Sequence, residues 1–279
     1  MEVFERIADV RKRRWTNPSE SWGFVPTMGF LHDGHISLVK KAREENDHVG
    51  VSIFVNPKQF NRKSDFDSYP IDIDSDLERL KEAGADLVWI PDAHHVYPDH
   101  FQTYVDVAEI TKELEGAARP GHFKGVTTIV SILFNVFQPT RAYFGQKDAQ
   151  QVAVIQRMVK DLQFNLDIIV CPTMREKDGL AMSSRNVNLS TKARKQAPVL
   201  YQSLLAAQKA IETGERSCAV IRNKMVNIIK QAELANIDYV STADPITLKE
   251  IETIKKGVLI SLAVYFGEVR LIDNLLLDL

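Results

Sequence analysis

The sequence predicts an α/β fold in which helices wrap a parallel sheet, followed by a smaller α+β domain. Up to about Met174, short apolar runs typical of buried strands alternate with helical patterns, and this alternation indicates a parallel sheet. Beyond that point, helical patterns come first and strand-like runs follow, which favours helices on an antiparallel sheet. We therefore expect a first domain over residues 1–174 and a second over 175–279.

The expected elements of the first domain follow from its apolar runs. Buried strands are expected at 22–25, 49–55, 87–90, 142–144 and 166–170, and helices at 35–46, 74–83, 124–137 and 148–161. Ligands of parallel sheets bind beyond the carboxyl ends of the strands. Polar loops that should therefore meet at one edge are Pro26-Thr27, Asn56–Gln59, Pro91-Asp92 and Gly145–Asp148.

The second domain begins with a polar, loop-like stretch at 175–190. Helical patterns follow near 191–213 and 216–235, and strands are expected at 237–241, 257–266 and 269–272.

Composition restricts the classes of function. The formal net charge is −2, so no overall electrostatic attraction to nucleic acid or acidic membranes is expected. Cys171 and Cys218 are too few for a disulfide framework and lack metal-site spacing. The first residues have no apolar core of a secretory signal, and no apolar run is long enough to span a bilayer. These features predict a cytoplasmic protein.

The most informative segment is Pro26-Thr-Met-Gly-Phe-Leu-His-Asp-Gly-His35, where a buried strand passes into a helix. Such a turn offers free backbone N–H groups and the positive end of a helix dipole to a phosphate chain. Histidines at this position can stabilise charge that develops during phosphoryl displacement. His35, at the expected helix start, is the better candidate, since His32 fits a local loop brace equally well.

Two further segments carry phosphate-binding groups. In Gly145-Gln-Lys-Asp148, Lys147 suits a phosphate, whereas Asp148 is either a helix cap or a group that faces the nucleotide or a water-bound Mg²⁺. Met182-Ser-Ser-Arg185 offers two hydroxyls and a guanidinium, although most polar loops are ordinary solvated linkers.

Three amide side chains, Asn56, Gln59 and Gln151, suit a small hydroxylated acid, although surface amides are common. Arg119–Lys124 is either an anionic-substrate site or only a turn before a helix. The histidine-containing run 94–100 is interpreted as a surface loop rather than a metal site. The sequence has no Ser-His-Asp or Cys-His signature, so a covalent protein nucleophile is not expected.

Taken together, five segments resemble the pantothenate synthetase (pantoate–β-alanine ligase) family of the nucleotidyltransferase superfamily, which carries a His-x-Gly-His-type turn. They occur in family order: Pro26–His35, Ser52–Phe60, Arg119–Val126, Phe144–Gln151 and Asp178–Asn186. The resemblance implies a Rossmann-like first domain, a smaller C-terminal lid and a homodimer.

The resemblance also implies an ATP-dependent ligation in two steps. Pantoate attacks ATP to give pantoyl adenylate and pyrophosphate, and β-alanine then displaces AMP to give pantothenate. Mg²⁺ would accompany ATP. The small molecules ATP, pantoate and β-alanine are the expected partners.

Residue roles carry over from the family by position. The catalytic groups implied are His35, as proton donor to the departing phosphate oxygens, with His32, Lys147 and Arg185. The ATP-binding residues implied are Met28, Gly29, Phe30, Leu31, His32, Asp33, Gly34, His35, Gly145, Gln146, Lys147, Asp148, Met174, Met182, Ser183, Ser184 and Arg185. Gln59, Gln151 and Asn56 would bind pantoate and β-alanine, and Asp76 and Asp148 are the candidate Mg²⁺ ligands.

The sequence departs from the family pattern at Phe30, Ile71, Gln146 and Met174, and two rival functions share some of its features. Gln146 replaces a common Glu, and Phe30 is bulkier than the usual Ala, so that it can narrow the nucleotide entrance. A nucleotidyltransferase that moves AMP or CMP and stops would share the histidine turn but release a stable nucleotide product. A nucleotide-sensing module would bind ATP without turnover, which the two histidines and Lys147 argue against.

Overall fold

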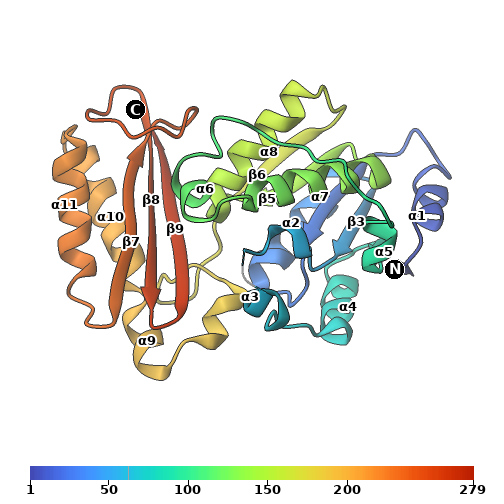
Figure 1. Cartoon of the computed structure of the whole chain (residues 1–279), viewed down its shortest axis with the longest axis horizontal. Coiled ribbons are helices and arrows are strands. Elements are labelled where there is room, and N and C mark those ends of the chain that lie inside the picture. The colour runs from blue at the N-terminus through green and yellow to red at the C-terminus, as the bar shows by residue number, and fades with distance from the viewer. Residues whose placement is uncertain (62) are drawn as a thin grey trace.

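A computed structural model describes residues 1–61 and 63–279 and contains two sheets that lie side by side (Figure 1). The first sheet has six parallel strands. In spatial order they are β1 (Glu2–Phe4), β4 (Leu87–Trp89), β3 (His48–Ile53), β2 (Trp22–Thr27), β5 (Arg141–Gly145) and β6 (Asp167–Cys171).

The five expected strands of the first domain are all present, and their order explains where a ligand binds. Counted along the chain they lie in the order third, second, first, fourth, fifth, so the direction of winding reverses between β2 and β5. Crevices for ligands open at such reversal points in Rossmann-like sheets. β1 was not predicted, because it has three residues and pairs only with β4 at the edge of the sheet.

Helices cover both faces of this sheet. One face packs against α2 (Asp33–Glu45) and α4 (Ile73–Glu82), and the other against α1 (Ile7–Arg14), α7 (His122–Phe137) and α8 (Ala149–Asp161). Neighbouring residues of β2 point to opposite faces, since Phe24 packs on the α7 side and Val25 on the α2 side. Burial on both faces accounts for the continuous apolar runs in the sequence.

Short elements complete the first domain, and some helix starts differ from expectation. α8 is preceded by a separate 3-10 turn, η2 (Gln146–Asp148), so the helix predicted from residue 148 begins one residue later. The remaining elements are η1 (Pro57–Gln59), α3 (Lys63–Asp67), α5 (Ala93–Val96) and α6 (Leu114–Ala118).

The second sheet is antiparallel, as predicted, and comprises β7 (Ala235–Ala243), β8 (Gly257–Phe266) and β9 (Val269–Asp278). Helices α10 (Val199–Glu212) and α11 (Cys218–Ile229) cover its outer face (Figure 1). The single helix expected at 191–213 is divided at Pro198 into α9 (Thr191–Gln196) and α10. Proline lacks the N–H that a continuous helix requires. In the described part of the chain, no helix is both long and apolar enough to cross a membrane.

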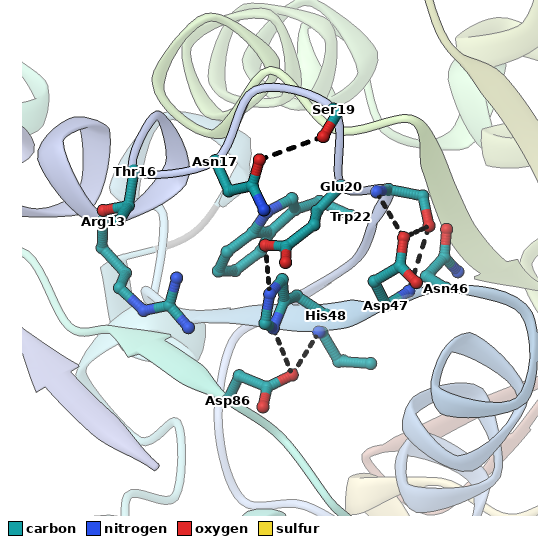
Figure 2. A network of polar contacts seen from close by, with 12 residues as sticks. Arg13, Thr16, Asn17, Ser19, Glu20, Trp22, Asn46, Asp47, His48 and Asp86 are labelled. Carbon is teal, nitrogen blue, oxygen red and sulfur yellow. Dashed lines mark hydrogen bonds and ion pairs between the residues drawn. The ribbon is translucent and has the colours of Figure 1, made fainter.

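A polar network closes the amino ends of β2 and β3, opposite to the end where ligands of parallel sheets bind (Figure 2). Nε2 of His48, the first residue of β3, lies 2.7 Å from Glu20, and its Nδ1 lies 3.5 Å from Asp86. The His48 ring packs on Trp22, with ring centroids 4.7 Å apart. This end of the sheet is thus joined by the contacts of His48 with two carboxylates and with an aromatic ring.

Candidate active site

The carboxyl ends of β2, β3, β5 and β6 surround a cavity of about 230 Å³. The predicted site residues that line it are Met28, His32, Gly34, His35, Asn56, Gln59, Gly145, Lys147, Asp148, Gln151, Met174, Met182, Ser183, Ser184 and Arg185. Segments far apart in the sequence therefore meet at the reversal point of the sheet.

Six of the predicted site residues do not line the cavity. They are Gly29, Phe30, Leu31, Asp33, Asp76 and Gln146. Phe30 lies outside the lining of this cavity, and its effect on the nucleotide entrance stays a prediction. The loop after β4, at Pro91-Asp92, also stays outside, because β4 lies two strands away from β2 in the sheet.

His32 and His35 form a reciprocal cap at the start of α2. Nδ1 of His32 accepts a hydrogen bond from the Gly34 N–H at 3.1 Å, and Nδ1 of His35 accepts one from the His32 N–H at 3.3 Å. In a neutral imidazole, the nitrogen that accepts leaves the other nitrogen protonated. Each ring therefore carries its proton on Nε2, which makes no hydrogen bond to any described residue and can donate to a ligand in the cavity.

The surroundings keep both rings neutral. Burial lowers the pKa of His32 to about 4, and the positive charges of Lys147 and Arg79 add to the effect. Burial, the neighbouring His32 and the same two cations lower the pKa of His35 to about 3. At neutral pH the pair therefore offers two N–H donors without a charge of its own.

Helix α4 holds the loop that carries these histidines. The Asp76 carboxylate accepts hydrogen bonds from the N–H groups of Phe30 and Leu31, at 2.8 and 2.7 Å. Arg79 donates to the Leu31 carbonyl at 2.9 Å and pairs with Asp33. Gly29 and Phe30 both adopt positive φ angles, 82° and 53°, which turn successive N–H groups toward Asp76. Asp76 is thus a buried brace of the loop, a role that the sequence did not suggest.

Lys147 and Asp148 contribute opposite charges to the cavity, with 3.6 Å between Nζ and the carboxylate. Their backbone is held by Asn274 of β9, whose amide nitrogen donates to the carbonyls of Gln146 and Lys147 at 3.0 and 2.8 Å. Gln146 returns a hydrogen bond to Asn274 Oδ1 at 3.0 Å. The Gln146 side chain therefore faces the second sheet.

The segment from Met174 to Arg185 is folded as a closed turn instead of an open linker. Met182 N–H bonds to the Met174 carbonyl at 2.9 Å, and Arg175 pairs with Ala181 in an antiparallel bridge. Arg175 also forms a buried ion pair with Asp273 of β9 at 2.6 Å. The turn leads into η3 (Ser184–Asn188) and brings Ser183 and Arg185 to the cavity.

A larger cavity of about 580 Å³ adjoins the first and lies between the two sheets. Lys147, Asp148, Gln151 and the Ser183–Arg185 segment line both cavities. In its lining, Glu115 of α6 forms a bidentate ion pair with Arg270 of β9, at 2.7 and 2.8 Å. The larger cavity therefore has walls from both parts of the chain.

Comparison with known proteins decides the family. The Pantoate-beta-alanine ligase model matches residues 2–276. A pantothenate synthetase of Herpetosiphon aurantiacus is 52% identical over 280 residues, covering 99% of this chain and all of that protein. The chain belongs to the pantoate–β-alanine ligase family.

Solved structures of this family agree with the fold. Pantothenate synthetase from Thermus thermophilus superposes with a TM-score of 0.94 at 45% identity, covering 99% of each chain. The pantoate–β-alanine ligase of Francisella tularensis, solved with β,γ-ATP and β-alanine, gives 0.81 at 37% identity, covering 99% of this chain and 97% of that one. The predicted α/β fold, the resemblance and the expected ATP-dependent ligase activity are thereby confirmed.

Several residues that build this candidate site were not predicted from the sequence. Arg79 on α4 and Glu115 on α6 contact residues that are far from them in the sequence. Arg270, Asp273 and Asn274 come from β9. One signal for the last three was available. The segment 270–274 places a cation, a carboxylate and an amide within an apolar run, although the strand predicted at 269–272 includes only the cation. Such groups leave water only when they have partners.

Proposed function

We propose that the chain uses this cavity to activate pantoate with ATP and then joins it to β-alanine. In the first step a pantoate carboxylate oxygen forms a bond to the α-phosphorus, and the bond to the bridging β-phosphate oxygen breaks, releasing pyrophosphate. In the second step the β-alanine nitrogen, after losing a proton, attacks the acyl carbon, and AMP leaves with the electrons of the C–O bond.

The observation that carries this proposal is the pair of uncharged Nε2–H donors beside Lys147. Charge builds on phosphate oxygens as pyrophosphate departs, and fixed donors aimed at that charge lower the barrier. His35 is proposed as the main donor and His32 as its assistant. Because both rings are neutral, we assign them a hydrogen-bonding role, whereas the positive charge comes from Lys147 and Arg185.

The remaining groups divide between the two substrates. Gln59 and Gln151 are proposed to hold the hydroxyl and carboxylate groups of pantoate, since both line the cavity that contains the histidines. The hydroxyls of Ser183 and Ser184 and the Arg185 guanidinium are proposed to contact the phosphates. The two anions repel each other, so cations near both make their approach feasible.

The site fits an Mg²⁺ ion that is held mainly by ATP. Among the described residues, no group of three or more His, Cys, Asp or Glu side chains is arranged to hold a metal ion. Asp148 is 47% exposed and lines the cavity, so it can supply one carboxylate to an ion bound by phosphates. Asp76 is engaged by two backbone N–H groups, which favours its bracing role over metal binding. When bound, Mg²⁺ would neutralise part of the triphosphate charge.

We also propose a domain division, an oligomeric state and a cellular location. The division at 174/175 is supported by the end of the parallel sheet at Cys171. A homodimer follows from the family resemblance and is tested by sedimentation equilibrium. A cytoplasmic location is supported by the two cysteines, both buried and unpaired.

A product analysis tests the proposed function. The protein is incubated with ATP, Mg²⁺ and pantoate, with and without β-alanine. Pyrophosphate and an enzyme-bound adenylate are expected without β-alanine, and AMP and pantothenate only when it is added. A stable nucleotide adduct that ignores β-alanine, or ATP binding without pyrophosphate release, would contradict the proposal.

A further inference from the structure

The turn that carries Gln59 is organised around Asn56, whose side chain is 1% exposed. The Asn56 amide nitrogen donates to Gln59 Oε1 at 3.0 Å and to the Gly125 carbonyl at 3.1 Å. Its Oδ1 accepts from the Lys58 N–H at 3.3 Å and from the Tyr97 hydroxyl at 2.7 Å. Every hydrogen-bonding position of this amide is therefore in use within the protein.

Two backbone groups fix which way Asn56 points. The Lys58 N–H can only donate and the Gly125 carbonyl can only accept, so the Asn56 oxygen must face the first and its nitrogen the second. The Asn56 nitrogen then requires an acceptor opposite it, and Gln59 supplies Oε1. The Gln59 NH₂ group is left on the side of Met28, at 3.1 Å from its sulfur, where both residues line the cavity.

Tyr97 is the member of this series of hydrogen bonds that does not line the cavity. It comes from the 94–100 run, interpreted from the sequence as a surface loop, and it follows α5 directly. Its ring packs against Phe101 with centroids 4.9 Å apart, and Lys58 Nζ lies 4.8 Å from its centre. These contacts hold the hydroxyl against Asn56 Oδ1.

The backbone of the same turn is held from α7. Nδ1 of His122 contacts the Gln59 carbonyl at 2.8 Å, while its Nε2 faces Arg119 at 3.1 Å. Because Arg119 can only donate, the His122 proton lies on Nδ1 and is donated to Gln59. A Cβ added at Gly125 would lie 2.3 Å from the Lys58 carbonyl oxygen, so only glycine permits this approach of α7. With the turn fixed, the direction of the Gln59 amide depends on its side-chain neighbours.

We propose that Tyr97 is a positioning residue for the acid substrate, because its hydroxyl completes the hydrogen bonds that hold Asn56 in the orientation set by the backbone and thereby keeps the Gln59 NH₂ group directed into the cavity. An NH₂ group donates to carboxylate and hydroxyl oxygens, whereas the reversed amide would present an oxygen to an anion. Tyr97 does not line the cavity, so it acts only through Asn56 and Gln59. This inference rests on the proposed role of Gln59 in pantoate binding.

The test is a double-mutant cycle on the full-length protein. Tyr97→Phe removes only the hydroxyl, and we expect the KM for pantoate to rise about two- to tenfold, the effect of one neutral hydrogen bond, with the KM for ATP unchanged. Tyr104→Phe is the matched control, because Tyr104 belongs to the same aromatic group but its hydroxyl contacts Lys58 Nζ at 3.2 Å. It should leave both KM values as in the parent.

The cycle separates this inference from the proposed function. In the Gln59→Ala background, Tyr97→Phe should cause no further loss, since the group it positions is gone. Additive losses, or equal changes in the KM values for pantoate and ATP, would overturn the inference while leaving the role of Gln59 intact. If Gln59→Ala itself leaves the KM for pantoate unchanged, the proposed role of Gln59 fails instead.

A second variant covers the case in which Tyr97→Phe does not fold. Asn56→Asp has nearly the same shape but places an acceptor opposite Gln59 Oε1, which favours the reversed amide. The KM for pantoate should then rise more than in Tyr97→Phe. An unchanged value in a folded Asn56→Asp protein would overturn the inference.

Discussion

The two ends of the six-stranded sheet hold histidines in opposite surroundings. At the carboxyl end, His32 and His35 lie near the cations Lys147 and Arg79. At the amino end, His48 lies between the carboxylates of Glu20 and Asp86 (Figure 2). The same residue type thus meets positive charge at one end of the strands and negative charge at the other.

The difference shows what distinguishes a site from a structural network. The two site histidines use Nδ1 for the backbone and keep Nε2–H available to the cavity. His48 instead directs Nε2 to Glu20 and packs its ring on Trp22. A histidine that keeps an N–H donor free and lies near cations can bind an anionic ligand. A histidine that contacts only other residues of the protein contributes to folding.

The largest effect is expected from His35→Ala. The variant should release pyrophosphate from ATP and pantoate about 100-fold more slowly or worse, the scale of losing one preorganised donor to developing charge. Single-turnover pyrophosphate release measures this step, and circular dichroism checks that the fold is retained.

The matched control is His48→Ala at the other end of the sheet. It should lower the free energy of unfolding but leave the rate of pyrophosphate release close to that of the parent. A His35→Ala protein with nearly normal release, or a His48→Ala protein with a comparable loss of rate, would remove the distinction between the two ends.

A smaller effect is expected from Lys147→Met. Removing a cation from a phosphate contact should raise the KM for ATP about 10- to 100-fold, the range for one charged hydrogen bond. Arg43→Met is the control, since Arg43 pairs with Asp86 at the amino end, and it should not alter the KM for ATP. Equal KM values for ATP in the parent and in Lys147→Met would contradict the phosphate role.

The pH dependence of stability should report the site histidines. Their folded pKa values, about 4 for His32 and about 3 for His35, lie below the unfolded value of about 6.5. As the pH falls below about 6.5, the unfolded chain binds protons that the folded chain does not, so stability is lost, by at most about 1.4 kcal/mol per pH unit for each histidine. Urea unfolding at pH 7 and pH 4.5 measures the loss.

His35→Ala provides the comparison for that experiment. With one buried histidine removed, the loss of stability between the two pH values should be smaller. An identical loss in the parent and the variant would show that His35 is not the neutral group described here.

Features set by local pattern could be predicted from the sequence. The parallel strands appear as apolar runs because both faces are buried, and the histidine turn is recognisable because strand, glycines and helix are adjacent in the chain. β1 could not be predicted, since three residues at the edge of a sheet are too few to show a strand-like pattern of apolar residues. Pro198 lies inside the single helix predicted at 191–213, and the structure shows that it separates α9 from α10.

Contacts between distant segments could not be predicted in this way. The sequence does not show that α4 presents Asp76 to the N–H groups of Phe30 and Leu31. The contact from Asn274 to the Lys147 backbone joins residues 127 positions apart. Tyr97 lies in a run of polar and aromatic residues, and only the folded chain brings its hydroxyl to Asn56.

The smallest effect is expected from Glu20→Gln. The Glu20 carboxylate is 34% exposed and its His48 partner 20% exposed, so solvent weakens their attraction. The free energy of unfolding should fall by less than about 1 kcal/mol, and less at high salt. In the His48→Ala background the same substitution should have no effect, because the partner is absent. Catalysis should be unchanged, and a reduced kcat at saturating substrates would show that charges at the amino end influence the site across the length of the strands.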